Sequence, residues 1–213
     1  NSGNSGGCRP KCLWHDREGA WLVKFRHTYD PKDIGRMEYK YNEVARKCGI
    51  NVPDYKLLDG KYFASKRFDI ENGKRLHIAT AGALLNESIS NPKLDYKVLL
   101  HLTGYLTQDS QQVDEMFQRM VFNVLTDNKD DHVKNFSFIC REGKWSLAPA
   151  YDLTLCKEGY HGEHATSANN KGNPDIEDML AVGESIRIPR RKGMEIINHM
   201  INHCQEILST RFE

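Results

Sequence analysis

Residues 125–138 read LTDNKDDHVKNFSF, and this stretch places three aspartates, two lysines, two asparagines and a histidine between the hydrophobic runs MVFNVL and FSFI. Charged groups fold at little cost only where water solvates them or where partners hold them. The stretch is therefore either a solvated turn or a site whose charges are held against a bound group. The remainder of the chain decides between these two interpretations.

The composition of the chain is that of an ordinary globular protein. Its 213 residues are 39% hydrophobic, which is enough for one domain or a two-lobed unit with a sizeable core. The 30 Lys and Arg nearly balance the 29 Asp and Glu, so no overall field favours a nucleic acid or a membrane. With no long apolar run and no signal-peptide pattern, we expect a cytoplasmic protein that makes no direct contact with nucleic acid or membrane.

The six cysteines are scattered through the chain, which predicts free thiols in a reducing compartment. A zinc site built from Cys8, Cys12, His161 and His164 is disfavoured, because their spacing matches no zinc-finger or zinc-ribbon pattern.

Strand and turn signals dominate the first third of the chain. CLWH (12–15) and AWLVKF (20–25) are strand-like and are joined by the turn DREG, which predicts a β-hairpin. Apolar residues at helical spacing predict a helix over 31–48 with Gly49 as its stop. Two short strands, DYKLLDG and KYFASKRFDI, are expected around the turn Asp59-Gly60.

From about residue 78 the pattern becomes mainly helical. Amphipathic helices are predicted over 95–107 and 111–127, before the charged stretch. A short hairpin over NFSFIC and KWSLAP follows it, then a polar segment over 157–175 and two closing helices over 175–184 and 190–210. We therefore expect an α+β fold with two lobes and a polar cleft between them. Residues 1–75 would form a small β-rich N-lobe and 76–213 a larger helical C-lobe.

Four features follow one another along this chain. They are the glycine-rich loop 3–7, Lys24 in WLVKF, Asp130 with Asn135 five residues later, and Asp152 after the second hairpin. Phosphoryl transfer from ATP uses such groups, because positioning and charge neutralisation lower its barrier. Each feature alone also has an ordinary structural explanation as a flexible terminus, a solvated strand lysine or a turn aspartate. Their order indicates phosphoryl transfer.

The segments DDHVKNFSF and LAPAYDLT, preceded by SGGCRPK, WLVKF and SKRFD, resemble the HipA-like serine/threonine kinases, the toxin components of bacterial toxin–antitoxin pairs. The resemblance runs from about residue 3 to residue 200 and is most specific across 130–154. It implies a two-lobed protein-kinase-like fold. It also implies ATP and Mg²⁺ as cofactors and the Ser or Thr hydroxyl of a bacterial protein as the acceptor.

The resemblance assigns roles to the charged stretch by position. Asp130 would accept the proton of the substrate hydroxyl, His132 and Lys134 would lie in the catalytic loop near the phosphates, and Asn135 with Asp152 would bind Mg²⁺.

The N-lobe receives its roles in the same way. Lys24 would hold the ATP phosphates, with Glu38 as a candidate ion-pair partner or else a surface charge. In SKRFD the Lys66 carbonyl and the Phe68 amide would contact adenine, and Asp69 would face the ribose. The glycine-rich loop would cover the phosphates with Gly3, Ser5, Gly6 and Gly7.

The chain also departs from the family pattern. Asp131 stands where well-known members have glycine, so we expect either that both carboxylates lie near Mg²⁺ or that one faces solvent. Asn4 aligns with the loop serine that toxin kinases autophosphorylate, although Ser2 and Ser5 are its neighbours. The chain begins at the loop, so we expect that the amino-terminal subdomain of full-length members either lies outside this sequence or is supplied by a separate small protein.

The favoured function is thus an ATP- and Mg²⁺-dependent serine/threonine protein kinase. By family analogy an aminoacyl-tRNA synthetase is the candidate substrate and a DNA-binding antitoxin the candidate partner. A degenerate kinase that binds nucleotide and serves as an interaction module is the first alternative, and a small-molecule kinase is the second.

Overall fold

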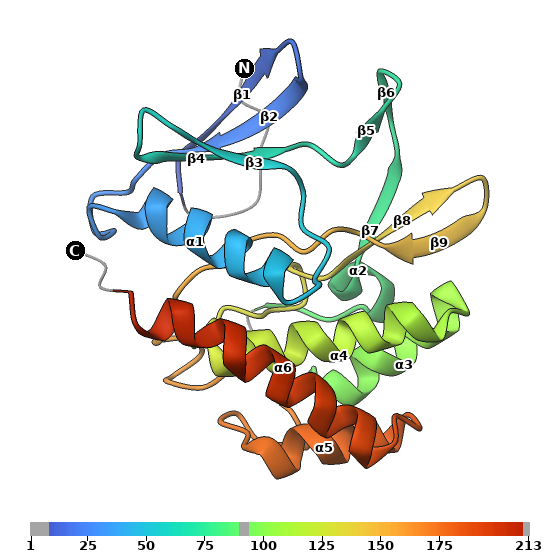
Figure 1. Cartoon of the computed structure of the whole chain (residues 1–213). Coiled ribbons are helices and arrows are strands. Elements are labelled where there is room, and N and C mark those ends of the chain that lie inside the picture. The colour runs from blue at the N-terminus through green and yellow to red at the C-terminus, as the bar shows by residue number, and fades with distance from the viewer. Residues whose placement is uncertain (1–8, 90–93, 211–213) are drawn as a thin grey trace.

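The computed structural model describes residues 9–89 and 94–210, and these form the two-lobed α+β arrangement that the sequence predicts. A four-stranded antiparallel sheet in the order β1-β2-β4-β3 lies above a group of helices (Figure 1). Its strands are β1 (Lys11–Asp16), β2 (Gly19–Lys24), β3 (Tyr55–Leu58) and β4 (Tyr62–Lys66). The two hairpins confirm the predicted strand pairs.

The β1–β2 hairpin is closed by its own turn residues. Asp16 Oδ1 accepts the backbone N–H groups of Glu18 and Gly19 and the indole N–H of Trp21. Gly19 adopts a φ of 131°, which is a region that favours glycine. The turn therefore fixes the register that places Lys24 at the end of β2.

Helix α1 (Ile34–Lys47) packs between the sheet and the helical lobe (Figure 1). A Cβ added at Gly35 would lie 1.9 Å from the Lys61 carbonyl oxygen, so only glycine allows this close approach to the start of β4. Toward the helical lobe, the Tyr41 hydroxyl donates to the Thr126 carbonyl at 2.5 Å. Lys40 and Lys47 both pair with Glu206. Helix α1 is therefore attached to both lobes.

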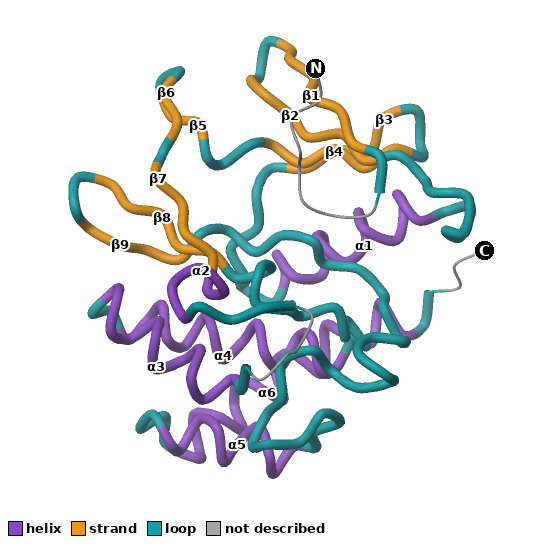
Figure 2. Tube along the Cα trace, turned by 180° about the vertical axis from the view of Figure 1, so that it is seen from behind, coloured by secondary structure: helices purple, strands orange, loops and turns teal. Residues whose placement is uncertain are grey.

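The helical lobe consists of α3 (Tyr96–Thr107), α4 (Ser110–Leu125), α5 (Ile176–Ser185) and α6 (Arg190–Leu208), seen from behind in Figure 2. Aspartates cap α3, α4 and α5 by accepting backbone N–H groups of the first turn. Buried side chains of α4 and α6, such as Phe117, Met120 and Ile197, belong to one hydrophobic core that also includes residues of α1.

The remaining elements connect the lobes. They are β5 (Ile70–Glu71), β6 (Lys74–Arg75), β7 (His77–Thr80), α2 (Ala81–Leu85), β8 (Ser137–Arg141) and β9 (Lys144–Leu147). Strands β8 and β9 form the hairpin predicted after the charged stretch, and β7 pairs with β8 in a three-stranded sheet that the sequence did not predict. The charged stretch thus lies between α4 and β8. The division of the chain at residues 75 and 76 stays a prediction.

Candidate active site

Lys24 is the centre of an ion-pair network in which Lys24 and Glu38 are largely buried and the Asp152 side chain is 33% exposed. Its Nζ lies 3.1 Å from Glu38 Oε1 on α1 and 2.6 Å from Asp152 Oδ1 in the segment after β9. The Lys24 side chain is 10% exposed and that of Glu38 is 3% exposed. The pairing of Lys24 with Glu38, one of two alternatives left open by the sequence, is present in the structure.

The three charges stabilise one another against the cost of burial. Burial alone would lower the pKa of Lys24, but the carboxylates of Asp152 and Glu38 hold this pKa above its ordinary value. Burial alone would raise the pKa of Asp152, and the Lys24 ammonium holds that pKa below its ordinary value. The site therefore keeps Lys24 cationic and Asp152 anionic at neutral pH.

Two further cations act on this network. They are Arg9, just before β1, and Lys11, the first residue of β1. Arg9 donates to Glu38 Oε1 at 2.9 Å and to Asp30 Oδ2 at 3.0 Å. The charge of Lys11 lowers the pKa of Asp152, after the larger effects of burial and Lys24. Sequence reasoning gave neither residue a role, although RPK directly after the glycine-rich loop was the available signal.

The charged stretch folds into a tight loop. Asn135 Nδ2 donates to the Asp130 carbonyl at 2.6 Å, and the Asn135 backbone N–H donates to the His132 carbonyl at 2.8 Å. These two hydrogen bonds close residues 130–135 into a turn. His132 Nε2 lies 3.9 Å from Asp130 Oδ1. Among the described residues, His132 Nδ1 is buried and has no hydrogen-bond partner.

Asp130 is the carboxylate that this loop presents outward. Its side chain is 56% exposed. Burial of part of the group raises its pKa, the nearby charge of His132 opposes this, and the Asp152 carboxylate raises the pKa further. An aspartate whose pKa is raised is a stronger proton acceptor once it is ionised.

Asp131 points the other way, into the helical lobe, and its side chain is completely buried. Its carboxylate accepts the Tyr96 hydroxyl at 2.6 Å, approaches His164 Nδ1 at 2.9 Å and accepts the Thr166 N–H at 3.2 Å. The Thr166 hydroxyl donates to the Asp131 carbonyl. Of the two adjacent carboxylates, Asp130 is therefore the one that faces solvent, and Asp131 joins the loop to the segment around residue 165.

Asp152 and Asn135 line one small hollow of about 10 Å³, together with Asn128, Asp131 and Tyr151. Asp152 has a φ of 56°, an uncommon conformation for a residue with a side chain, of the kind that is concentrated at functional sites. The Tyr151 hydroxyl donates to the carbonyl of Lys134, whose own side chain is exposed. Residues 135 and 152 thus meet at one hollow, and Asp130 lies beside them, bonded to Asn135 through its carbonyl and within the electrostatic reach of Asp152.

The segment SKRFD lies at the exit from β4. The Phe68 ring stacks on the Tyr151 ring, with centroids 5.7 Å apart. Asp69 is held by the guanidinium of Arg67, which lowers its pKa. Lys66 is the last residue of β4. The loop residues Gly3, Ser5, Gly6 and Gly7, with Asn4, lie outside the described residues.

Comparison with known proteins gives the family. The sequence model of the HipA-like C-terminal domain matches residues 3–208, and the chain belongs to this family. The chain is 27% identical over 169 residues to Y4dM of Sinorhizobium fredii, a protein provisionally named a kinase. The match covers 71% of this chain and 41% of that protein, so the chain spans less than half the length of this relative.

Solved structures give the same class of fold. HipA of Shewanella oneidensis, in a complex with HipB and operator DNA, matches with a TM-score of 0.78 at 19% identity, over 96% of this chain and 58% of that one. The Helicobacter pylori proinflammatory kinase CtkA matches with a TM-score of 0.59 at 14% identity, over 92% and 90%. The predicted resemblance and the kinase-like two-lobed fold are confirmed.

Proposed function

We propose that the chain is an ATP- and Mg²⁺-dependent serine/threonine protein kinase. The observation that carries the proposal is the Lys24 network, in which one lysine contacts both Glu38 and Asp152. Protein kinases use this combination to hold the nucleotide phosphates and the metal. Membership of the HipA-like family and the kinase-like fold support it.

The donor set fits a magnesium ion. Asn135 and Asp152 both line one hollow, and their side chains carry an amide oxygen and carboxylate oxygens. Mg²⁺ prefers oxygen ligands with few protein carboxylates. Glu38 Oε2 is buried and has no hydrogen-bond partner among the described residues. Because the Glu38 carboxylate pairs with Lys24, we do not propose it as a metal ligand. When bound, the ion would neutralise charge that develops on the phosphates.

The residues of this chain would then have separate tasks. Asp130 accepts the proton of the acceptor hydroxyl on its exposed carboxylate, and Asn135 fixes the Asp130 backbone. Lys24 is oriented toward the phosphates by Glu38, and His132 and Lys134 lie in the same loop. The hinge residues Lys66, Phe68 and Asp69 are proposed to contact the nucleoside. To contact the nucleoside, the Asp69 carboxylate would have to share or give up its hydrogen bonds from Arg67.

The acceptor and the partners are proposed on family grounds. A bacterial protein such as an aminoacyl-tRNA synthetase is the proposed substrate. The complex of the Shewanella HipA with HipB and operator DNA supports a DNA-binding antitoxin as partner. No helix among the described residues is long and apolar enough to cross a membrane.

The test is transfer of label from γ-labelled ATP to bacterial lysate proteins by the wild-type chain and by Asp130→Ala and Asp152→Ala. We expect a loss of about 10²- to 10⁴-fold in each variant. Full transfer by both variants would falsify the assignment. A thermal shift with MgATP in the wild type but no transfer would favour the nucleotide-binding module instead, because ligand binding alone raises the melting temperature. Transfer only to small hydroxylated metabolites would favour the small-molecule kinase.

A further inference from the structure

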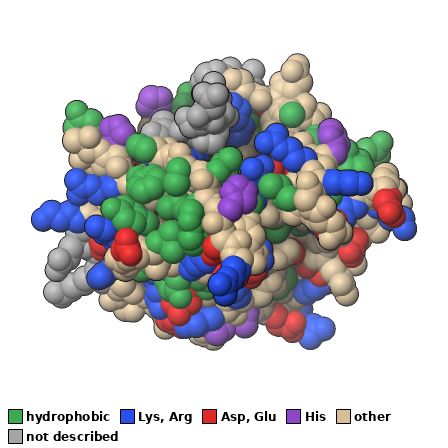
Figure 3. Space-filling model, turned by 90° about the horizontal axis from the view of Figure 1, so that it is seen from above, with side chains coloured by type: hydrophobic (Ala, Val, Ile, Leu, Met, Phe, Trp, Pro, Cys, Tyr) green, Lys and Arg blue, Asp and Glu red, His purple; other side chains and the backbone are tan. Residues whose placement is uncertain are grey.

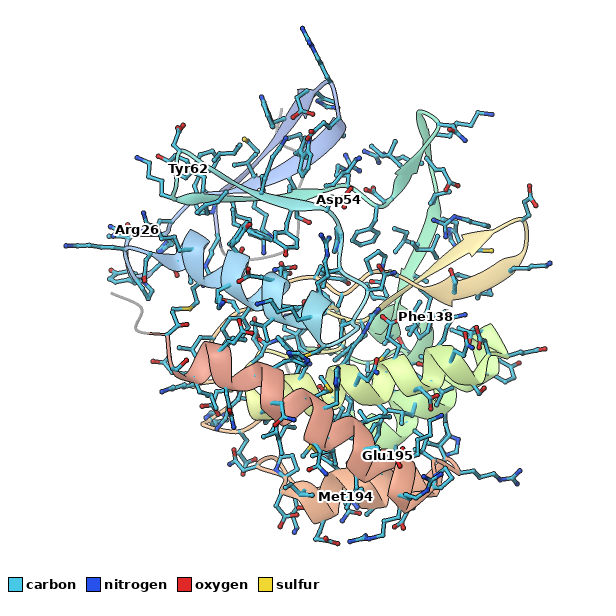
Figure 4. The ribbon with its side chains drawn as sticks, in the orientation of Figure 1. Arg26, Asp54, Tyr62, Phe138, Met194 and Glu195 are labelled. Atoms are coloured by element: carbon cyan, nitrogen blue, oxygen red, sulfur yellow. The ribbon has the colours of Figure 1, made fainter. Side chains whose placement is uncertain are left out.

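A second hollow lies on the N-lobe, where the carboxyl end of β2 and the amino end of α1 meet the start of β4. Its volume is about 210 Å³. Phe25, Tyr62, Phe63 and Ile34 form apolar walls, and the Phe25 and Tyr62 rings pack with centroids 5.3 Å apart. Figure 4 labels Arg26 and Tyr62 at this end of the sheet, beside the first turn of α1. None of these wall residues belongs to the loop that carries Asp130.

The charges around this hollow are strongly unbalanced. Among the described residues that line it, five are cationic and one is acidic. Arg9 and Lys24 are paired with the single carboxylate, Glu38. The other three cations are Arg26, Lys32 and Lys61, all exposed. In the part of the chain that the structure describes, none of these three makes an ion pair, and Lys61 only lies over the Tyr62 ring.

The backbone adds to the positive potential. Ile34 and Gly35, the first residues of α1, line the hollow. The amino terminus of a helix carries a partial positive charge and unused N–H groups. The first turn of α1 has no acidic residue, and Asp33, its N-cap, makes no side-chain capping hydrogen bond. The excess of side-chain cations is therefore the main source of positive potential around the hollow, and the helix terminus adds a smaller part.

We propose that this hollow is a second binding site for a phosphoryl group, beside the site of phosphoryl transfer, with which it shares the Lys24–Glu38 pair as one wall. A compact dianion would relieve the repulsion between Arg26, Lys32 and Lys61, and the Arg26 guanidinium offers a planar pair of donors that matches phosphate oxygens. The apolar walls Phe25 and Tyr62 leave room for part of the molecule that carries the phosphoryl group. The space-filling view from above shows hydrophobic side chains with Lys and Arg distributed around them on this lobe (Figure 3).

The test measures binding directly, so its outcome does not depend on the proposed kinase activity. The probes are the capped tripeptides Gly-phosphoserine-Gly, Gly-Ser-Gly and Gly-Asp-Gly, together with inorganic phosphate, titrated by calorimetry or NMR. The nucleotide site is first filled with MgATP analogue that cannot be hydrolysed. The variant is Arg26→Gln combined with Lys32→Gln. The matched control is Arg17→Gln combined with Lys144→Gln. Both cations are exposed, one in the β1–β2 turn and one at the start of β9, and neither lines the hollow.

We expect saturable binding of the phosphoserine peptide to the wild type and at least about 10-fold weaker binding to the Arg26→Gln/Lys32→Gln variant. The control should change by less than about 2-fold, because salt screens distant surface charges. Tighter binding of the peptide than of inorganic phosphate identifies a phosphorylated protein segment as the source, and equal binding identifies a free phosphate compound. Undetectable binding at millimolar concentration, an equal effect in the control, or equal affinity for the aspartate peptide would overturn the proposal.

Discussion

Lys24 Nζ and Asp152 Oδ1 are 2.6 Å apart although the two residues are separated by 128 positions in the chain. One ends a strand of the four-stranded sheet and the other follows the β8–β9 hairpin, so the contact joins the two lobes across the candidate active site. An incoming phosphate group would share the Lys24 ammonium with Asp152. The contact therefore places the cation where nucleotide phosphates and a metal ligand would meet.

Glu38 pairs with both Lys24 and Arg9, so replacing it should slow turnover. We expect Glu38→Gln to lower the rate of phosphoryl transfer by about 10²-fold, because misplacement of a positioning group by about 1 Å has an effect of that size. The measurement is steady-state transfer from labelled ATP. Glu43→Gln, on the same helix and paired only with Lys40, is the control and should retain full activity. An active Glu38→Gln variant would remove Glu38 from the site.

The pH dependence should report on Asp130. Because the pKa of Asp130 is raised above its ordinary value of 3.8, the rate should rise with pH through a midpoint above 3.8 as the carboxylate ionises. The charge of His132 lowers this pKa, so His132→Gln should move the midpoint to higher pH. The measurement is the pH profile of kcat/KM. His199→Gln, an exposed histidine of α6, should leave the midpoint unchanged. A shift to lower pH in His132→Gln would contradict the assignment.

Asp16 should make the stability of the N-lobe hairpin depend on acid. Its hydrogen bond with Lys56 lowers the pKa of Asp16 from 3.8 to about 2. Since the pKa is depressed in the folded state, the stabilising effect is complete above 3.8 and is lost as the pH falls toward about 2. The difference in urea midpoint between wild type and Asp16→Asn should therefore shrink across this window. Asp59→Asn, in the β3–β4 turn, is the control. A difference that stays constant in acid would refute this linkage.

Asp131 should stabilise the fold of the loop, and any effect of its replacement on catalysis should follow from the loss of that stability. Asp131→Asn puts an amide N–H group where Tyr96, His164 and Thr166 already donate, which should cost about 1–3 kcal/mol of unfolding free energy. The measurement is chemical denaturation. Asp127→Asn, at a left-handed position that asparagine also adopts, is the matched control. Unchanged stability of Asp131→Asn would show that the network is dispensable.

Gly35 tests the packing of α1 on the sheet. An added methyl group would lie 1.9 Å from the Lys61 carbonyl oxygen, so Gly35→Ala should destabilise the protein by at least about 1–3 kcal/mol. The thermal unfolding midpoint is the measurement. Gly104→Ala, in α3, has ordinary contacts at 3.4 Å or more and should be neutral or stabilising because alanine favours helices. Equal midpoints for Gly35→Ala and wild type would contradict the close approach.

The sequence predicted most elements because their signals are local. The hairpins carry turn residues, and the long helices carry apolar residues at helical spacing. Strand β7 was not predicted, because the four residues HIAT are too few to show an alternation of apolar and polar side chains. The segment becomes a strand by pairing with β8, about sixty positions later.

The candidate site was predicted unevenly for a similar reason. Asp130, Asn135 and Asp152 stand in a motif with fixed spacing, and the structure brings them together. The partners of Asp131, namely Tyr96, His164 and Thr166, come from distant segments and had no local signal. Arg9 likewise meets Glu38 only because the tertiary fold brings them together.

The attachment of α1 to both lobes has a consequence for control. An outward swing of this helix would break the Tyr41 bond to Thr126 and the ion pairs to Glu206, together with the pair between Glu38 and Lys24. For the proposed kinase, control by displacement of α1 would therefore cost contacts with the helical lobe as well as the contact with Lys24.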